Sequence, residues 1–282
     1  MADHIDDLAN AKVTARNFYG TLRVLDEITA SAGAYRTLMH GQIVHGMQFE
    51  APEKQDVPTA YYSEESGIGR TLLAKAAMAT STAGKSTSKS LRVGIIGVGI
   101  GTLVTYGRPG DYFRLYDIDP LVVALARTEF SFLSRTKAST DTILGDARMM
   151  MEREIPQQFD VLVVDAFSGD AVPIHLLTRE AFAGYFKHLK PDGVLVVHVT
   201  NRFLDLNPVV KTAVESFNKV ARLVTLKSDS SRLIFHSNWV LASADREFFA
   251  HSLIHEVAES IDVRPGFRLW RDDYSSVLAV LK

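Results

Sequence analysis

Two kinds of hydrophobic pattern divide this chain within its first third. Residues 13–50 mix β-branched and aromatic residues with turn glycines, which predicts a small antiparallel β-sheet. A polar loop after Pro58 leads into an amphipathic helix from about Ile68, and a small, polar stretch at 81–90 is typical of a linker. The sequence therefore predicts an N-terminal β-rich domain with a connecting helix over residues 1–80, followed by this linker.

From residue 91 to residue 282, short apolar runs alternate with amphipathic segments. The expected strands are five to seven residues long and lie at 92–97, 112–117, 141–145, 159–165, 193–199, 222–227 and 238–242. The expected helices lie between them, at 120–130, 147–154, 178–188 and 207–220. Several strands are apolar throughout, as parallel strands covered on both faces are. We predict an α/β domain with a Rossmann-like, doubly wound sheet.

Glycine or aspartate follows each of the first four expected strands of this domain. In chain order these residues are Gly97, Gly99 and Gly101; Asp117 with Ile118 and Asp119; Gly145, Asp146 and Ala147; and Asp165. Ligands of doubly wound sheets bind at the carboxyl ends of the strands, where glycines let backbone N–H groups approach closely. An acid after the second strand accepts two hydrogen bonds from a ribose diol. The pattern predicts an adenosine-type cofactor, and Asp146 has a helix N-cap as its alternative role.

A second acidic feature follows the fourth strand, where Asp165 and Asp170 share one loop with a glycine and a proline. Nearby carboxylates repel each other, so they favour a cationic partner or raise one pKa into the range of a general base. A solvated turn is the alternative for Asp170. We expect His175 to begin the next helix and His198 to be a hydrogen-bonded residue of the core.

Composition and charge exclude several classes of function. The 31 basic and 33 acidic residues give a net charge of −2, which offers no electrostatic case for a nucleic-acid partner. The chain has no cysteine, and His40 and His45 lack nearby third ligands, so we expect no metal site. No apolar run approaches the roughly 18–20 residues that span a bilayer, and the N-terminus lacks the plan of a signal peptide. We expect a soluble, cytoplasmic protein without a membrane span.

Taken together, the motifs resemble those of the spermidine synthase (aminopropyltransferase) family over about residues 15 to 200. The matching elements are His40-Gly41, Tyr62-Ser63-Glu64, Gly97-Val98-Gly99-Ile100-Gly101, Asp117-Ile118-Asp119, Gly145-Asp146-Ala147 and Asp165 through Pro173. The stretches GRPGDYF and HVTNRFLDLNPVV are most similar to the synthase-like domain found fused to membrane transporters.

The resemblance implies a fold like that of class I S-adenosylmethionine-dependent methyltransferases. It implies transfer of an aminopropyl group from decarboxylated S-adenosylmethionine to a small amine such as putrescine, with release of methylthioadenosine, and a homodimer. The implied cofactor-binding residues are Gly97, Gly99, Gly101, Asp117, Ile118, Asp146 and Ala147, with Asp117 on the ribose and Asp146 on the adenine. Asp165 is implied as the base on the amine, helped by Tyr62. Asp170 and Glu64 are implied to bind the substrate.

Two positions depart from the family pattern. Ile100 stands where the family has an aspartate that resembles a clamp for the donor's ammonium group, and Val44 stands where it has a glutamine, with His45 and Gln48 as nearby substitutes. Two alternatives therefore stay open. The first is a methyltransferase or another transferase that uses intact S-adenosylmethionine. The second is a non-catalytic module that binds a nucleoside or a polyamine.

Overall fold

The N-terminal part of the chain forms a four-stranded antiparallel sheet. The computed structural model describes residues 11–81, 89–166 and 173–282. The four strands pair in chain order and are β1 (Val13–Asn17), β2 (Gly20–Thr29), β3 (Gly33–His40) and β4 (Ile43–Phe49). Gly41, with φ of 60°, supplies the left-handed residue of the two-residue turn between β3 and β4. This sheet confirms the prediction made from residues 13–50.

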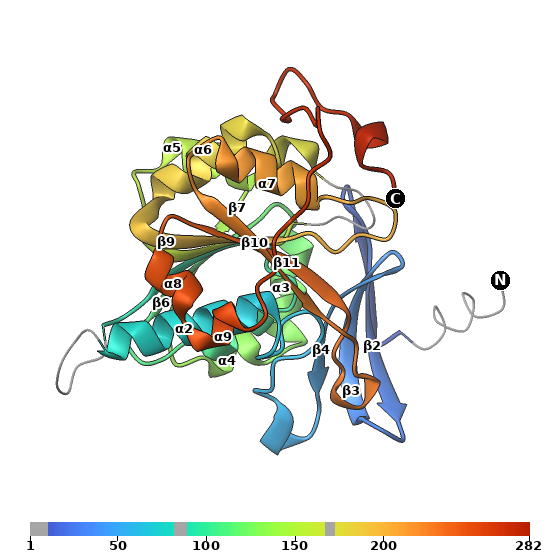
Figure 1. Ribbon diagram of the computed structural model, residues 1–282. Coiled ribbons are helices and arrows are strands. Elements are labelled where there is room, and N and C mark those ends of the chain that lie inside the picture. The colour runs from blue at the N-terminus through green and yellow to red at the C-terminus, as the bar shows by residue number, and fades with distance from the viewer. Residues whose placement is uncertain (1–10, 82–88, 167–172) are drawn as a thin grey trace.

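The rest of the chain is built on a seven-stranded mixed sheet, which confirms the Rossmann-like prediction (Figure 1). Its strands are β5 (Arg92–Ile96), β6 (Tyr112–Asp117), β7 (Ser139–Leu144), β8 (Phe159–Val164), β9 (Leu189–His198), β10 (Val220–Leu226) and β11 (Ser237–Ser243). Their order is β10-β11-β9-β8-β5-β6-β7, so the direction of winding changes between β5 and β8. The β11 strand runs antiparallel to both neighbours. Apolarity alone did not predict this reversal.

Helices cover both faces of this sheet (Figure 1). One face carries α2 (Gly67–Ser81), α3 (Pro120–Thr128), α4 (Phe132–Arg135), α8 (Arg246–Ala250) and α9 (Ser252–His255). The other face carries α5 (Ala147–Arg153), α6 (Arg179–His188) and α7 (Asn207–Glu215). The α7 helix ends before the expected residue 220, because Asn218 takes a left-handed turn and β10 begins two residues later.

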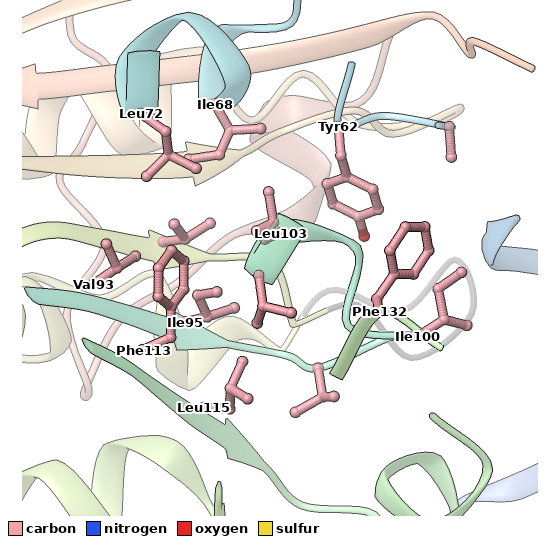
Figure 2. Close-up of a cluster of buried hydrophobic side chains, with 14 of the residues drawn as sticks. Tyr62, Ile68, Leu72, Val93, Ile95, Ile100, Leu103, Phe113, Leu115 and Phe132 are labelled. Carbon is pink, nitrogen blue, oxygen red and sulfur yellow. The ribbon is translucent and has the colours of Figure 1, made fainter. Parts of the chain in front are cut away.

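Alternation along the central strands produces two cores. In β8, Val161 and Val163 belong to the first core, whereas Leu162 and Val164 belong to the second, and all four are buried. This is why a continuous apolar run marks a central parallel strand. The first core, part of which Figure 2 shows, continues without a break into the N-terminal sheet. The residues of that sheet in the first core are Leu22, Val24, Tyr35, Leu38, Met47 and Phe49.

Candidate active site

A cavity of about 820 Å³ opens at the carboxyl ends of the parallel strands, where the winding changes direction. The N-terminal sheet closes one side of it through Tyr19 and the β3–β4 turn, and Tyr61 and Tyr62 contribute from the segment before α2. Its volume lies in the range of small-molecule sites. The predicted site residues that line it are Tyr62, Gly97, Gly99, Asp117, Ile118, Asp146, Ala147 and Asp165.

Asp117 ends β6 and is held by backbone donors on both carboxylate oxygens. Its Oδ2 accepts from Val98 N at 2.8 Å and its Oδ1 accepts from Asp119 N at 2.9 Å. Burial raises the pKa of Asp117 to about 6, although these two backbone hydrogen bonds act in the opposite direction. The carboxylate of Asp117 is therefore ionised at neutral pH, and the two backbone hydrogen bonds fix its orientation at the cavity wall.

Two glycines allow the loop after β5 to pass close to other backbone. An added Cβ at Gly97 would lie 2.2 Å from the carbonyl oxygen of Asp165, and one at Gly99 would lie 2.9 Å from that of His45. Both glycines also have positive φ. The loop is therefore threaded between β8 and the N-terminal sheet, with no room for side chains on these two residues.

The next residue of this loop, Ile100, does not face the cavity. Its side chain is only 1% exposed and lies in the first core, beside Phe132 (Figure 2). An added Cβ at Gly46 of β4 would lie 2.6 Å from Ile100 Cγ1, so the isoleucine fills the junction between the two sheets. Ile100 therefore contributes no group to the cavity at the position where the family pattern has an aspartate.

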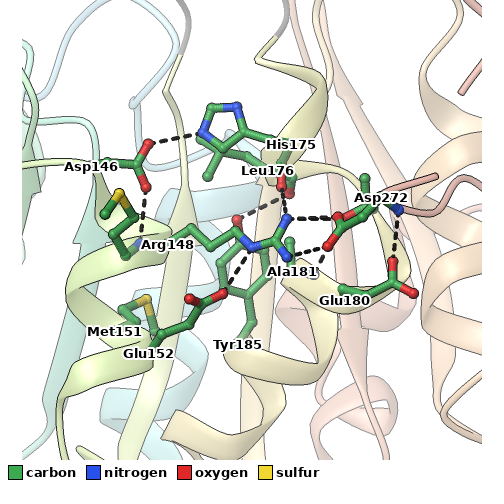
Figure 3. Close-up of polar contacts among 12 residues, drawn as sticks. Asp146, Arg148, Met151, Glu152, His175, Leu176, Glu180, Ala181, Tyr185 and Asp272 are labelled. Carbon is green, nitrogen blue, oxygen red and sulfur yellow. Dashed lines mark hydrogen bonds and ion pairs between the residues drawn. The ribbon is translucent and has the colours of Figure 1, made fainter. Parts of the chain in front are cut away.

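Asp146 caps α5 and reaches the cavity at the same time. Its Oδ1 accepts from Met149 N at 2.9 Å, and its Oδ2 lies 2.9 Å from His175 Nε2 (Figure 3). Arg148 donates to the carbonyl oxygen of His175 at 2.9 Å and pairs with both carboxylate oxygens of Asp272. Asp146 thus caps the helix, as its alternative role predicted, and also lines the cavity together with His175.

Asp165 follows β8 and is bonded on both oxygens by side chains. Tyr62 donates its hydroxyl to Oδ2 at 2.7 Å, and His198 Nδ1 lies 2.7 Å from Oδ1. An ionised carboxylate only accepts hydrogen bonds, so His198 donates through Nδ1. Burial, followed by the charge of Asp165, raises the pKa of Tyr62 well above its usual value, so the phenol stays neutral.

The N-terminal sheet adds His45 to the cavity wall. Burial lowers the pKa of His45 to about 4, with the neighbouring His40 acting in the same direction, so the ring is neutral at pH 7. Its Nε2 is buried and has no hydrogen-bond partner among the described residues. Gln48, the other expected substitute, instead bonds Ser131 and the carbonyl oxygen of Gln55, so its amide is used in holding the fold.

Two expected site residues lie outside the cavity lining, and a third is not among the described residues. Glu64 is exposed and does not line the cavity, because the chain turns Tyr62 inward and Glu64 outward before α2. Gly101 begins a short 3₁₀ helix against Leu133 and also stands outside the lining. Asp170 falls in residues 167–172, outside the described part of the chain.

Among the lining residues that were not predicted as site residues, three have ionisable rings close to Asp146 or Asp165. His175 and His198 were assigned to structural roles, and Tyr61, whose pKa burial raises to about 12, was not considered. His198 is buried as expected, but it also ends β9 beside the end of β8. The strand-end rule that found Asp165 would have found it too.

Two kinds of feature are absent from the described residues. No group of three or more His, Cys, Asp or Glu side chains is arranged to hold a metal ion in the ranges 11–81, 89–166 and 173–282. No helix in those ranges is both long enough and apolar enough to cross a membrane.

Comparisons with known proteins agree with this geometry. No protein-family model matches the chain. A polyamine aminopropyltransferase of Vibrio vulnificus is 33% identical over 115 residues, which cover 39% of this chain and 38% of that relative. An N-terminal histidine N-methyltransferase of Emericella nidulans is 33% identical over 112 residues, which cover 37% of this chain and 19% of that protein. The matches thus span well under half the length of these relatives.

Solved structures extend the likeness to most of the chain. A probable spermidine synthase from Corynebacterium glutamicum aligns with a TM-score of 0.60 at 20% identity, over 82% of this chain and 79% of that one. The spermidine synthase of Thermotoga maritima aligns with a TM-score of 0.54 at 15% identity, over 88% of this chain and 76% of that one. At these identities the likeness concerns the fold.

The chain has a Rossmann-like domain with an added N-terminal sheet, and this fold is similar to that of the solved spermidine synthases. Its matched segment is also similar in sequence to a polyamine aminopropyltransferase, so the chain is spermidine synthase-like in both respects. The resemblance predicted from the motifs is confirmed.

Proposed function

We propose that this protein transfers an aminopropyl group from decarboxylated S-adenosylmethionine to a small amine and releases methylthioadenosine. One observation carries the proposal: the carboxylate of Asp165, bonded by Tyr62 and His198, lines the cavity directly after β8, which lies between β9 and β5 in the sheet. A fixed, buried carboxylate at that point suits removal of a proton from an attacking amine.

The reaction balances with one base. The amine nitrogen attacks the methylene carbon beside the sulfonium, the carbon–sulfur bond breaks, and the sulfur leaves as a neutral thioether. The attacking nitrogen gives up one proton, which Asp165 accepts. Because a protonated amine has no lone pair, the base and the alignment of the two reactants supply most of the rate.

The nucleoside is assigned to the end of the cavity formed after β6 and β7. Asp117 would accept hydrogen bonds from the ribose hydroxyls and Asp146 from the adenine amino group, with Ile118 and Ala147 against the base. Gly97 and Gly99 let backbone approach the donor. Asp170 keeps the role implied by the resemblance, as a carboxylate near the acceptor, and Glu64 is left out.

Tyr62 and His198 act as positioning residues. Both donate to Asp165, so the plane of its carboxyl group is fixed before the amine arrives. The ring of His198 is in turn stacked on Trp239, with centroids 4.4 Å apart and planes 16° from parallel. Asp165, the proposed base, is therefore oriented by His198, whose ring is in turn fixed by its stacking on the buried Trp239.

Methyl transfer from intact S-adenosylmethionine is the second candidate. The buried side chain of Ile100 supports it, because the glycine loop there offers no carboxylate to repel the carboxylate of the intact donor.

Calorimetry separates the two candidates, with decarboxylated S-adenosylmethionine, S-adenosylmethionine, methylthioadenosine and NAD as ligands. Tighter binding of the decarboxylated donor, followed by methylthioadenosine release with an amine, supports the first candidate. Tight binding of S-adenosylmethionine with S-adenosylhomocysteine as product replaces it with the second. Binding without turnover across an amine panel favours a non-catalytic module.

A further inference from the structure

Asn17, the last residue of β1, joins the N-terminal sheet to the end of the cavity that we assign to the nucleoside. Its Nδ2 donates to Asp119 Oδ1 at 2.5 Å, although the two residues are 102 positions apart in the chain. Its Oδ1 accepts from Tyr19 N at 2.9 Å, which fixes the orientation of the amide. Tyr19 and Asp119 both line the cavity. One amide therefore connects two parts of the cavity wall that come from different sheets.

The carboxylate of Asp119 depends on this contact. Asp119 is only 3% exposed, and its Oδ1 accepts from Asn17 Nδ2 and, as the N-cap of α3, from Leu121 N at 2.8 Å. Its Oδ2 is buried and has no hydrogen-bond partner among the described residues. A buried carboxylate is costly when its donors are lost. Within the described ranges, Asn17 is the side chain that donates to it.

Asp119 in turn holds Asp117, the carboxylate that we assign to the ribose. Its backbone N donates to Asp117 Oδ1 at 2.9 Å and is one of the two backbone donors described above. Its charge acts on the same group, because the raised pKa of Asp117 is caused mainly by burial and also by the charge of Asp119. A displaced Asp119 would therefore move both a hydrogen-bond donor and a charge beside Asp117.

The turn that follows Asn17 is fixed on its own sheet. His40 Nε2, at the end of β3, lies 2.8 Å from the carbonyl oxygen of Tyr19. Gly20 has φ of 138°, and an added Cβ there would lie 2.4 Å from His40 Nε2, so the turn packs directly on this ring. Asn17 is thus a fixed anchor, and Asp119 is held against it.

We propose that Asn17 is a positioning residue for the nucleoside: through Asp119 it holds Asp117 in the orientation that accepts hydrogen bonds from the ribose hydroxyls. This inference rests on the proposed function. It adds the N-terminal sheet to the parts of the protein on which donor affinity depends.

A double-mutant cycle tests the contact. In Asn17→Asp a carboxylate replaces the amide that faces Asp119, and because two carboxylates repel, affinity for methylthioadenosine should fall by at least about tenfold. In the Asp119→Asn background the same change gives a complementary pair: the new amide donates to the new carboxylate, which still accepts from Tyr19 N. Asparagine also caps helices, so α3 keeps its cap. In that background Asn17→Asp should change the affinity by less than about twofold.

Kinetics and stability distinguish positioning from a merely structural role. Asn17→Asp should raise the KM for the donor and leave kcat within about twofold, because Asp165 and its two partners are unchanged. Urea unfolding on the same preparations measures stability separately, and lower stability with unchanged affinity would show a structural role only. Arg16→Ala is the control, because Arg16 is exposed and precedes Asn17 on β1. It should leave the affinity unchanged.

The outcomes separate this inference from the proposed function. Equal weakening by Asn17→Asp in both backgrounds, or no weakening in the native background, overturns the inference. If such a protein releases methylthioadenosine with an amine, the proposed function stands. Weakening that disappears in the Asp119→Asn background, measured by calorimetry, supports the inference even if no amine gives turnover. That second result would overturn aminopropyl transfer and leave Asn17 as a positioning residue of a nucleoside site.

Discussion

His198 Nδ1 lies 2.7 Å from Asp165 Oδ1, and both side chains are less than a tenth exposed. Strand β9 thus orients the carboxylate that follows its neighbour β8, while Tyr62 holds the other oxygen from outside the sheet. The group assigned to proton transfer is fixed by two segments remote from it in sequence.

Replacing Asp165 should separate chemistry from binding. In Asp165→Asn the amide no longer accepts a proton, so kcat should fall by about 10²–10⁴. Affinity for methylthioadenosine should stay within a few-fold, because Asp117 and Asp146 are untouched. Steady-state kinetics and calorimetry on one preparation measure both quantities.

Variants of the positioning residue His198 provide a comparison for Asp165→Asn. His198→Gln retains a donor toward Asp165 and should keep more activity than His198→Ala, with the difference in kcat rather than in donor KM. Loss of nucleoside binding in Asp165→Asn would instead place Asp165 in the nucleoside site alone.

Nucleoside affinity should depend on the ionisation of Asp117. Burial raises its pKa to about 6, above its usual 3.8, so the carboxylate becomes protonated as the pH falls through 6. Association constants for methylthioadenosine should then fall by up to about tenfold per pH unit below 6 and be level above 7. Asp117→Ala should weaken every adenosine ligand at all pH values. Titration calorimetry from pH 4.5 to 8 checks this, and a level profile would contradict it.

A carboxylate at position 100 should damage the fold. Because Ile100 is buried against Gly46 and Phe132, Ile100→Asp loses apolar burial and places a charge in the core, costing about 3–5 kcal/mol of unfolding free energy. Ile100→Val is the control and should cost about 1 kcal/mol. Urea unfolding measures both. A stable Ile100→Asp protein with better selection of the decarboxylated donor would show that this side chain reaches the cavity.

The pair between Arg148 and Asp272 should stabilise the C-terminal segment. The hydrogen bonds from Arg148 hold the pKa of Asp272 at about 2, below its usual 3.8, so the stabilisation is present above pH 4 and lost as the pH falls toward 2. Since Asp272 is partly exposed, Asp272→Asn should cost only about 1 kcal/mol at pH 7. Unfolding at pH 7 and pH 3 checks the difference. Asp273→Asn, at an 83% exposed side chain, is the control and should change little.

Local patterns of apolar residues predicted most strands and helices, but they did not predict the direction in which neighbouring strands pair. Apolar runs located the strands of the large sheet, and the strand-end rule found Asp117, Asp146 and Asp165 before any fold was known. The antiparallel direction of β11 was not predicted, because a buried strand has the same pattern of apolar residues whether it runs parallel or antiparallel to its neighbours.

Local sequence patterns do not predict what a single side chain contacts in the fold. Ile100 stands where the resemblance places an aspartate that contacts the donor, yet its side chain meets Gly46 of β4, about fifty residues earlier. Whether a loop side chain points to ligand or core depends on a contact that is distant in sequence. The same holds for Glu64, which turns away although Tyr62, two residues before it, turns inward.

The close approach of Gly99 to the carbonyl oxygen of His45 also limits how this protein can be recombined. The loop that we propose receives the donor is shaped on one side by β4, so the N-terminal sheet could not be exchanged without changing this loop. A chimera carrying the equivalent sheet of a relative would reshape the donor pocket even if every residue facing the donor were kept.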